Sequence, residues 1–434
     1  MAEAITVSCG AVASMLALAL TEHRLHPRHL SVRIFWLAPL VGALLMLLLG
    51  VLSPAEVWQG LTADTAVNPL KILILFFAMT LMSVFLDEAG FFRYLAGVVL
   101  THAGTSQKKL FALLYVAVSV LTVFTSNDIV VLTFTPFICY FAKHAKIDPL
   151  PYLICEFVAA NTWSMALIIG NPTNIYLATS AGIDFAGYLA VMLLPTVLGG
   201  VTSFAVLWLL FSRRLKQEMI PSSEVEHIAD KPTVALGVAS LGGCIALMVI
   251  SSYIDVPMWL IAAFCCVVLY GIAVPELLCR HRTLSPVTHS LVRAPFDVIP
   301  FVLSMFVLVM GLEGVGVSAI LSSFLLGGSG EILKTGIASF LAANLVNNIP
   351  MSVLFSTVVV PAGGIASLPA LYAAVIGSNV GAFFTPMGAL AGIMWMALLR
   401  QYHVQLSFGK FVLYGAAISI PTLLASLLGL VIML

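Results

Sequence analysis

Charged residues are scarce in this chain: they make up 9% of its 434 residues, whereas apolar residues make up 61%. Soluble domains carry about 25% charged residues, so this composition excludes an ordinary water-soluble fold. The net charge is zero, so no nucleic-acid partner is expected. The apolar residues form long continuous runs rather than short alternating segments. The chain is therefore predicted to be an all-α polytopic membrane protein and not a β-barrel.

Motifs of enzymes and metal sites are also missing. The seven cysteines form no CxxC pair or zinc spacing, and we interpret them as small core hydrophobes. No HExxH, GxSxG, P-loop or haem-ligand pattern is present, so we expect no enzyme activity, cofactor or metal. Any transport is then secondary, or an external ATPase subunit supplies the energy. The first apolar run lacks a basic n-region and is interpreted as a true span rather than a removable signal peptide.

Four polar interruptions stand inside otherwise apolar segments, arranged as two pairs. Thr125–Asp128 and Gly170–Asn174 lie in the first half, and Asn347–Pro350 and Thr385–Gly388 lie roughly 220 residues downstream of their counterparts. Hydrocarbon tolerates such backbone only where it lines a cavity or is buried in protein. Broken segments at corresponding positions of two halves indicate the substrate site of a transporter.

The positions of Lys and Arg predict the sidedness of the spans. If the N-terminus is outside, all but two of the nineteen basic residues are cytoplasmic, and the exceptions, Lys71 and Lys334, are near membrane boundaries. The loop 22–33 is then cytoplasmic, the loop 53–68 is external, and the protein is placed in the bacterial inner (plasma) membrane. The candidate spans are 3–21, 33–53, 69–87, 185–211, 233–253, 256–275, 296–312 and 409–433, besides the interrupted regions.

The first interruption is interpreted as the tip of a re-entrant hairpin. Its flanking segments, 110–124 and 129–142, are each about 22 Å long as helices, short of the roughly 30 Å hydrocarbon core. Basic residues precede the pair at Lys108 and follow it at Lys146, so both ends lie on one side. The alternative is two short, tilted spans that cross fully and give the same sidedness.

The second half repeats this pattern in the opposite orientation, which indicates an inverted-topology repeat. Residues echo one another between the halves, as Gly90 and Gly316 do, and Asn161 and Asn379. The predicted organisation is an additional span and cytoplasmic loop (1–32), repeat 1 (33–211, with hairpin 109–142 and broken helix 150–182), a cytoplasmic linker and extra span (212–255) and repeat 2 (256–434, with hairpin 335–360 and broken helix 370–399).

These stretches resemble the arsenite permease family of the ion transporter superfamily, which also holds divalent-anion symporters and sodium/proton antiporters. The resemblance rests on Leu86–Phe92, Ser126–Asp128, Leu132–Pro136, Gly170–Asn174, Arg293–Pro295, Asn347–Pro350, Ile376–Gly381 and Thr385–Leu390. It implies a homodimer in which a mobile transport domain moves against a scaffold domain like an elevator, with proton or sodium coupling. Two features resemble different branches of the superfamily. The run Asn171–Asn174 looks more like the citrate, anion and sodium/proton branches, whereas Thr385–Leu390 and Trp395 look more like the arsenite branch.

The interruptions carry side chains suited to a polar solute. Amides both donate and accept hydrogen bonds, hydroxyls add to them, and exposed helix N-termini suit an anion or a hydroxylated solute. These residues also cap helices and turns as a rule, and a cap can still bind through its second lone pair. The candidate substrate-binding residues are Ser126, Asn127, Asn171, Thr173, Asn174, Asn347, Asn348, Ser378, Asn379 and Thr385.

Two acids in apolar surroundings are candidates for ion coupling. An ionised carboxylate at the bilayer centre costs about 3 kcal/mol, so Asp128 is interpreted as a proton relay or cation ligand, with an N-cap for a helix beginning at Ile129 as the alternative. Glu156 is the second candidate, with a buried structural strut as its alternative. Asp87 and Glu88 lie at a span end, where placement at the membrane interface explains them.

These observations favour a secondary transporter that exports arsenite or antimonite by proton exchange. Arsenite is a neutral trihydroxy species at neutral pH, and no Lys or Arg stands in the four interruptions. The alternatives are a sodium- or proton-coupled carrier of a small anion, such as a carboxylate or oxyanion, and a sodium/proton antiporter. A channel is a further alternative, but a static pore would not require inverted hairpins.

Overall fold

The computed structural model describes residues 2–25, 36–63, 68–220, 227–254, 256–328, 330–360 and 367–434. Parts of three expected loops, 22–33, 53–68 and the linker from 212, therefore lie outside the described residues. Apart from an isolated bridge between Ser106 and Glu218, the described elements are helical. Within these described ranges, seven helical segments are long and apolar enough to cross a membrane, in agreement with an all-helical membrane protein.

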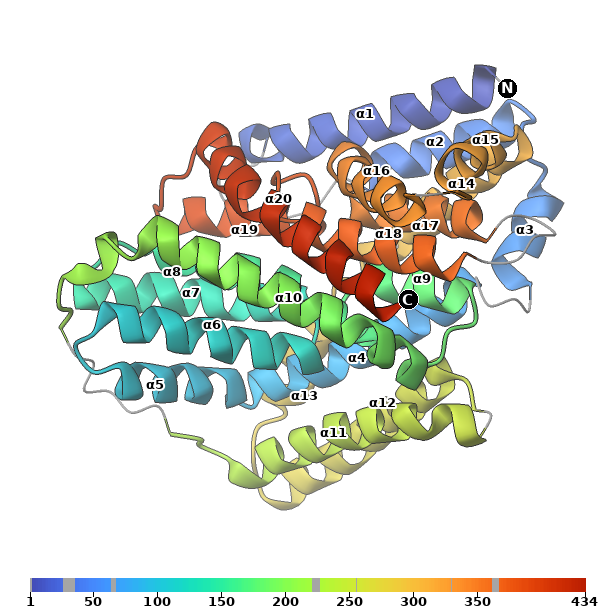
Figure 1. Cartoon of the computed structure of the whole chain (residues 1–434). Coiled ribbons are helices and arrows are strands. Elements are labelled where there is room, and N and C mark those ends of the chain that lie inside the picture. The colour runs from blue at the N-terminus through green and yellow to red at the C-terminus, as the bar shows by residue number, and fades with distance from the viewer. Residues whose placement is uncertain are drawn as a thin grey trace.

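The first half of the chain contains helices α1 to α10 (Figure 1). Their bounds are α1 Ala2–Leu25, α2 Leu37–Leu48, α3 Pro54–Thr62, α4 Pro69–Glu88, α5 Phe91–Ala103, α6 Gln107–Phe124, α7 Asn127–Ala145, α8 Leu150–Trp163, α9 Pro172–Ser180 and α10 Phe185–Phe211. The second half contains α11 Lys231–Ile254, α12 Met258–Cys279, α13 Ser285–Arg293, α14 Val298–Gly314, α15 Val317–Leu325, α16 Glu331–Val346, α17 Asn348–Val359, α18 Leu368–Gly381, α19 Leu390–Gln401 and α20 Phe408–Met433. Helices end at all four predicted interruptions.

A core bundle is flanked by helices on two opposite sides (Figure 1). The core bundle, α6–α10 with α16–α20, is held together chiefly by the packing of α10 on α20 and of α16 on α18. On one side lie α1, α2 and α14, which also packs on α17 of the core bundle, and on the other side lie α4 and α11–α13. These two flanking groups are together called the outer bundle. Glycine allows the closest approach inside the core bundle: a Cβ on Gly377 would lie 2.0 Å from Ser339 Oγ and 2.3 Å from the Gly336 carbonyl oxygen.

Four short helices, α3, α5, α13 and α15, are not among the predicted spans. Features of the local sequence begin three of them, α3, α5 and α15. A capping box begins α3, where Ser53 Oγ accepts from the Glu56 amide at 3.2 Å and Glu56 accepts from the Ser53 amide at 2.7 Å. Gly90 and Gly316, with φ of 90° and 81°, begin α5 and α15. A left-handed φ favours glycine, so this echo between the halves has a structural counterpart.

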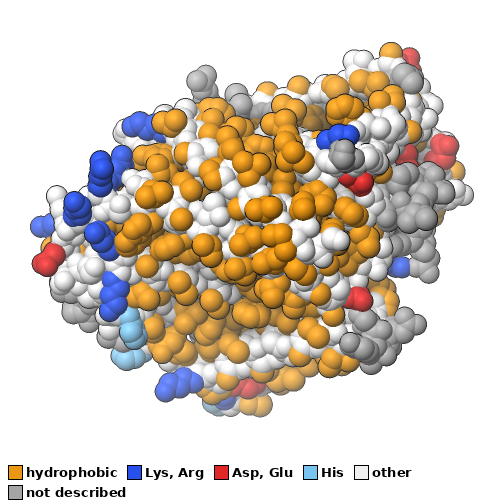
Figure 2. Space-filling model, viewed as in Figure 1, with side chains coloured by type: hydrophobic (Ala, Val, Ile, Leu, Met, Phe, Trp, Pro, Cys, Tyr) orange, Lys and Arg blue, Asp and Glu red, His pale blue; other side chains and the backbone are white. Residues whose placement is uncertain are grey.

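The surface has the charge pattern of a membrane protein. Figure 2 shows a broad hydrophobic face, with Lys and Arg side chains gathered mainly at the left-hand end of the view. Helices on this surface expose large apolar side chains, such as Leu209 (76%) and Leu413 (70%). The end rich in Lys and Arg is the one that the positive-inside rule predicts to be cytoplasmic.

Candidate functional site

The first broken segment separates α8 from α9. After Trp163 the chain makes two 3-10 turns, with Leu167 extended between them, and Asn171 is extended before α9. Asn171 caps α9, because its Oδ1 accepts from the Thr173 amide at 3.1 Å. Pro172 has no amide hydrogen to leave unpaired at the start of α9. The break thus presents the N-terminus of α9 inside the protein.

The second broken segment, between α18 and α19, is organised by an asparagine from another helix. Asn344 of α16 accepts hydrogen bonds through Oδ1 from the Thr385 hydroxyl (2.7 Å) and the Thr385 amide (3.1 Å). Its Nδ2 donates to the Gly381 carbonyl at 3.0 Å. A Cβ on Gly388 would lie 2.4 Å from the Gly381 carbonyl oxygen, so this turn requires glycine. Asn344 therefore holds the break open and binds it to α16.

The two breaks meet through Asn379 of α18. Its Nδ2 donates to Asn174 Oδ1 at 2.7 Å, and its Oδ1 accepts from Asn171 Nδ2 at 3.1 Å and from Ser164 Oγ at 2.8 Å. Ser378 Oγ donates to Thr173 Oγ1 at 3.1 Å. Asn174, Ser378 and Asn379 have no exposed surface. Side chains more than 200 positions apart in the sequence thus form one buried polar network.

The tip of the first hairpin joins this network through α8. The break at Thr125–Ser126 ends α6, and α7 begins at Asn127. Asn127 Nδ2 donates to Asn161 Oδ1 at 2.9 Å. Ser126 is the N-cap residue, and its side chain makes no cap hydrogen bond; its hydroxyl donates instead to Asn127 Oδ1 at 3.5 Å.

The tip of the second hairpin bends at Asn347, whose φ of 74° is rare for a residue other than glycine. Its Nδ2 donates to the Met387 carbonyl at 3.1 Å, and the Asn348 amide donates to the Gly388 carbonyl at 3.1 Å. The Asn348 side chain is 3% exposed and makes no hydrogen bond within the described residues. A side-chain amide can both donate and accept hydrogen bonds, so Asn348 is a strong candidate to bind a cargo.

The two candidate acids lie in different surroundings. Asp128 is half-buried in the first turn of α7, so it is not the N-cap, because the helix begins at Asn127 rather than at Ile129. Glu156 of α8 has no exposed surface, and the Thr135 hydroxyl lies 3.0 and 3.1 Å from its two oxygens. It is about 7.5 Å along the helix from Asn161, so the amide network and Glu156 are separate.

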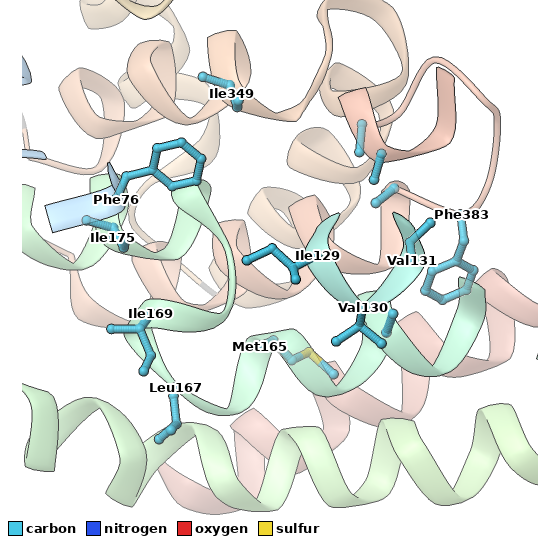
Figure 3. Close-up of a cluster of buried hydrophobic side chains, with 14 of the residues drawn as sticks. Phe76, Ile129, Val130, Val131, Met165, Leu167, Ile169, Ile175, Ile349 and Phe383 are labelled. Carbon is cyan, nitrogen blue, oxygen red and sulfur yellow. The ribbon is translucent and has the colours of Figure 1, made fainter. Parts of the chain in front are cut away.

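The segments that carry the polar network also carry buried apolar side chains. Figure 3 shows Ile129 of α7, Ile169 within the first break, Ile175 of α9 and Ile349 at the start of α17. Phe76 of α4 also lies in this cluster. Hydrogen bonds are stronger in surroundings of low dielectric constant, and an unpaired amide is correspondingly costly.

Three residues that organise the site were not among the predicted substrate-binding residues: Asn161 and Ser164 of the polar network and Asn344 at the second break. Asn161 had been noted only as the echo of Asn379. A signal for Asn344 exists in the sequence: it is an amide in an apolar helix, one turn before the break at Asn347. The predicted binding residues all lie at the breaks or in the helical turns beside them.

The fold resembles that of a known transporter. The crystal structure of the Alcanivorax borkumensis YdaH transporter matches with a TM-score of 0.54 at 14% identity, covering 90% of this chain and 88% of that one. The family model described as the citrate transporter, CitMHS, matches residues 16–367. This chain therefore belongs to the CitMHS family of membrane transporters and is not an enzyme.

Relatives with curated names agree with the resemblance noted from the sequence. The arsenical pump membrane protein of Escherichia coli K12 is 28% identical over 417 residues, which are 92% of this chain and 93% of that protein. A putative arsenical pump membrane protein of Bacillus subtilis is 28% identical over 400 residues, or 86% and 88%. The resemblance to the arsenite permease family is thereby confirmed.

Proposed function

We propose that this protein is a secondary active transporter that exports arsenite or antimonite by proton exchange. The main support for this cargo is the chemistry of the buried site, whose hydrogen-bonding groups are amides, hydroxyls and carbonyls. A neutral trihydroxy solute both donates and accepts hydrogen bonds, as amides do. The names of the relatives support the same cargo.

The two bundles support an elevator mechanism. The site lies in the core bundle, whose helices pack mainly with one another, so this bundle can move as a body carrying the site. We propose that it is the transport domain of an inverted repeat, that α6–α7 and α16–α17 are re-entrant hairpins, and that the outer bundle is the scaffold of a homodimer. Cysteines placed near Lys108 and Lys146 should both react with cytoplasmic thiol reagents, and labelling from opposite sides would contradict the hairpin.

The coupling residue is proposed to be Asp128, with Glu156 as a second protonation site. Asp128 lies one residue after Asn127, which is bonded to the network. The matching residue of the second repeat is Asn348, so a carboxylate is supplied from one repeat alone. Protonation of Asp128 would change the charge beside the cargo, which is how a proton can be exchanged for it.

Transport in everted membrane vesicles tests the cargo. Vesicles containing the protein should accumulate arsenite when the lumen is acid, and a protonophore should stop this accumulation. The control is vesicles with the Asn348→Leu variant at equal protein content. Accumulation that is the same with and without the protein, or that a protonophore does not change, would contradict the proposal.

A small anion is the second candidate cargo, because the family model that matches is described as a citrate transporter. The N-termini of α7, α9 and α17 lie at the interruptions, and helix N-termini favour anions. Sodium-dependent citrate uptake without arsenite transport would favour this candidate. Sodium/proton exchange without any solute would instead favour an antiporter that uses Asp128.

A further inference from the structure

A charged cluster ties α4 to α13 in the outer bundle. Arg293 Nη1 donates to Asp87 Oδ2 at 2.7 Å and also bonds to Glu88, and His289 lies 3.2 Å from Glu88. Asp87 lies at the end of α4, as the sequence indicates, and its side chain is 5% exposed. The Arg293 guanidinium pairs with this carboxylate, and the pairing lets it be buried within the protein.

The same Asp87 oxygen also reaches the core bundle. The Thr133 hydroxyl of α7 donates to Asp87 Oδ2 at 3.0 Å. Two residues later, Thr135 donates to Glu156 inside the core bundle. Successive threonines of α7 thus hold carboxylates on opposite sides of the helix, one in each bundle. This arrangement gives a role to the segment Leu132–Pro136, which the proposed cargo site leaves unexplained.

The position of the core bundle indicates the state in which this contact forms. In Figure 1, the left-hand ends of α6, α7, α8 and α10 reach beyond those of α11 and α12. This is the end at which Lys and Arg gather in Figure 2, and which the positive-inside rule assigns to the cytoplasm. In this view these core helices therefore extend further toward the basic end than α11 and α12 do.

We propose that the core bundle is here displaced toward its basic end, and that Asp87, fixed by Arg293, is a latch that holds α7 by Thr133 and stabilises this displaced state. The proposal rests on the proposed elevator mechanism, in which α7 slides past α4. A carboxylate ordered by an ion pair is a strong acceptor, so Thr133 is held until the core bundle moves and the hydrogen bond breaks. Arg293 is a positioning residue, since it pairs with the Asp87 carboxylate and orients it.

The latch belongs to one end of the transport cycle. Val353 occupies the position of the second hairpin that matches Thr133, and valine has no hydroxyl to donate. The opposite displaced state therefore receives no equivalent hydrogen bond from that position. The latch biases the resting carrier toward the basic end, where a cytoplasmic cargo would be collected for export.

Distances between spin labels measure the state without any cargo. A cysteine-free protein would carry labels at Tyr140 of α7 and Val267 of α12, which are 57% and 71% exposed. One distance should dominate in the otherwise unchanged protein. Thr133→Val should raise the population at a second distance by about tenfold or more, as expected for the loss of a hydrogen bond to a charged group. Thr133→Ser keeps the hydroxyl and should leave the population at the second distance unchanged.

Two arginine variants form a matched pair. Arg280 bridges Asp230 (2.8 Å) and Glu276 (2.5 Å) in the outer bundle, as Arg293 bridges Asp87 and Glu88. Arg293→Gln should shift the distances in the same direction as Thr133→Val, and Arg280→Gln should leave them unchanged. Identical distances in Thr133→Val and in the unchanged protein would overturn the latch, as would an equal shift in Thr133→Ser. A shift in a protein that moves no arsenite would instead retain the latch and refute the cargo.

Discussion

The site contains asparagines that bond to other side chains and an asparagine that does not. Truncating the first kind should lower stability, and truncating the second should impair transport. Asn379 makes hydrogen bonds with Asn174, Asn171 and Ser164, and a fourth with the carbonyl of its own helix at Val375. The Asn348 side chain makes none within the described residues. Asn379→Ala should therefore damage the structure, whereas Asn348→Ala should damage transport alone.

The size of the difference follows from the partners left behind. Each buried polar group that loses its only partner costs about 1–3 kcal/mol. Asn379→Ala affects three side chains in the network, and some will pair again after small shifts, so a loss of about 3–5 kcal/mol of unfolding free energy is expected. Asn348→Ala removes no hydrogen bond within the described residues, and its cost should stay below about 1 kcal/mol.

Unfolding and transport should be measured on the same preparations. Thermal unfolding in detergent should give a markedly lower midpoint for Asn379→Ala and a midpoint near that of the unchanged protein for Asn348→Ala. In vesicles, Asn348→Ala should raise the KM for arsenite at least tenfold, the effect of losing about 1.4 kcal/mol of binding. Equal destabilisation by the two variants, or an unchanged KM in Asn348→Ala, would refute the division into structural and cargo-binding amides.

Three further predictions concern coupling and packing. Asp128→Asn should reduce proton-driven flux at least tenfold in vesicles while leaving the elution profile on size exclusion unchanged; retained coupling would remove Asp128 from the mechanism. Glu156→Gln keeps an oxygen for its threonine partner, so the free energy of unfolding should change by less than about 1 kcal/mol. If Glu156 is a second protonation site, the variant should change the pH profile of the flux. An unchanged profile would mean that Glu156 is a structural strut. Gly377→Ala places a methyl group 2.0 Å from Ser339 Oγ and should lower the free energy of unfolding by about 1–3 kcal/mol or more. Gly271→Ala, with open space around it, should slightly raise the thermal midpoint. Equal midpoints for the two variants would show that α16 and α18 are not closely packed.

The interruptions of the helices could be predicted because they depend on local chemistry. Clusters of polar residues in an apolar run mark where the helix ends, and helices do end at Phe124, Trp163, Val346 and Gly381. A single proline is not enough, because Pro195 and Pro421 lie inside α10 and α20. The predicted binding residues follow from the same signal. Their roles as cargo ligands remain predictions, since the structure shows chiefly how they bond to one another.

The pairing of these residues could not be predicted, because it depends on how distant helices pack. Nothing local to Asn344 indicates that Thr385, 41 positions away, is its partner. The burial of Asp87 depends likewise on Arg293, 206 positions away. The short helices α3 and α5 escaped prediction for another reason: caps and a left-handed glycine begin them, and their hydrophobic runs are too short for a span.

Locating a bound antimonite tests the central claim most directly. Antimony scatters X-rays anomalously, so crystals grown with antimonite would show its position independently of the protein density. We predict a peak between the two breaks and the two hairpin tips, within hydrogen-bonding reach of the Asn348 amide. A peak elsewhere in the protein, or no peak under conditions in which the same preparation transports antimonite, would contradict the account.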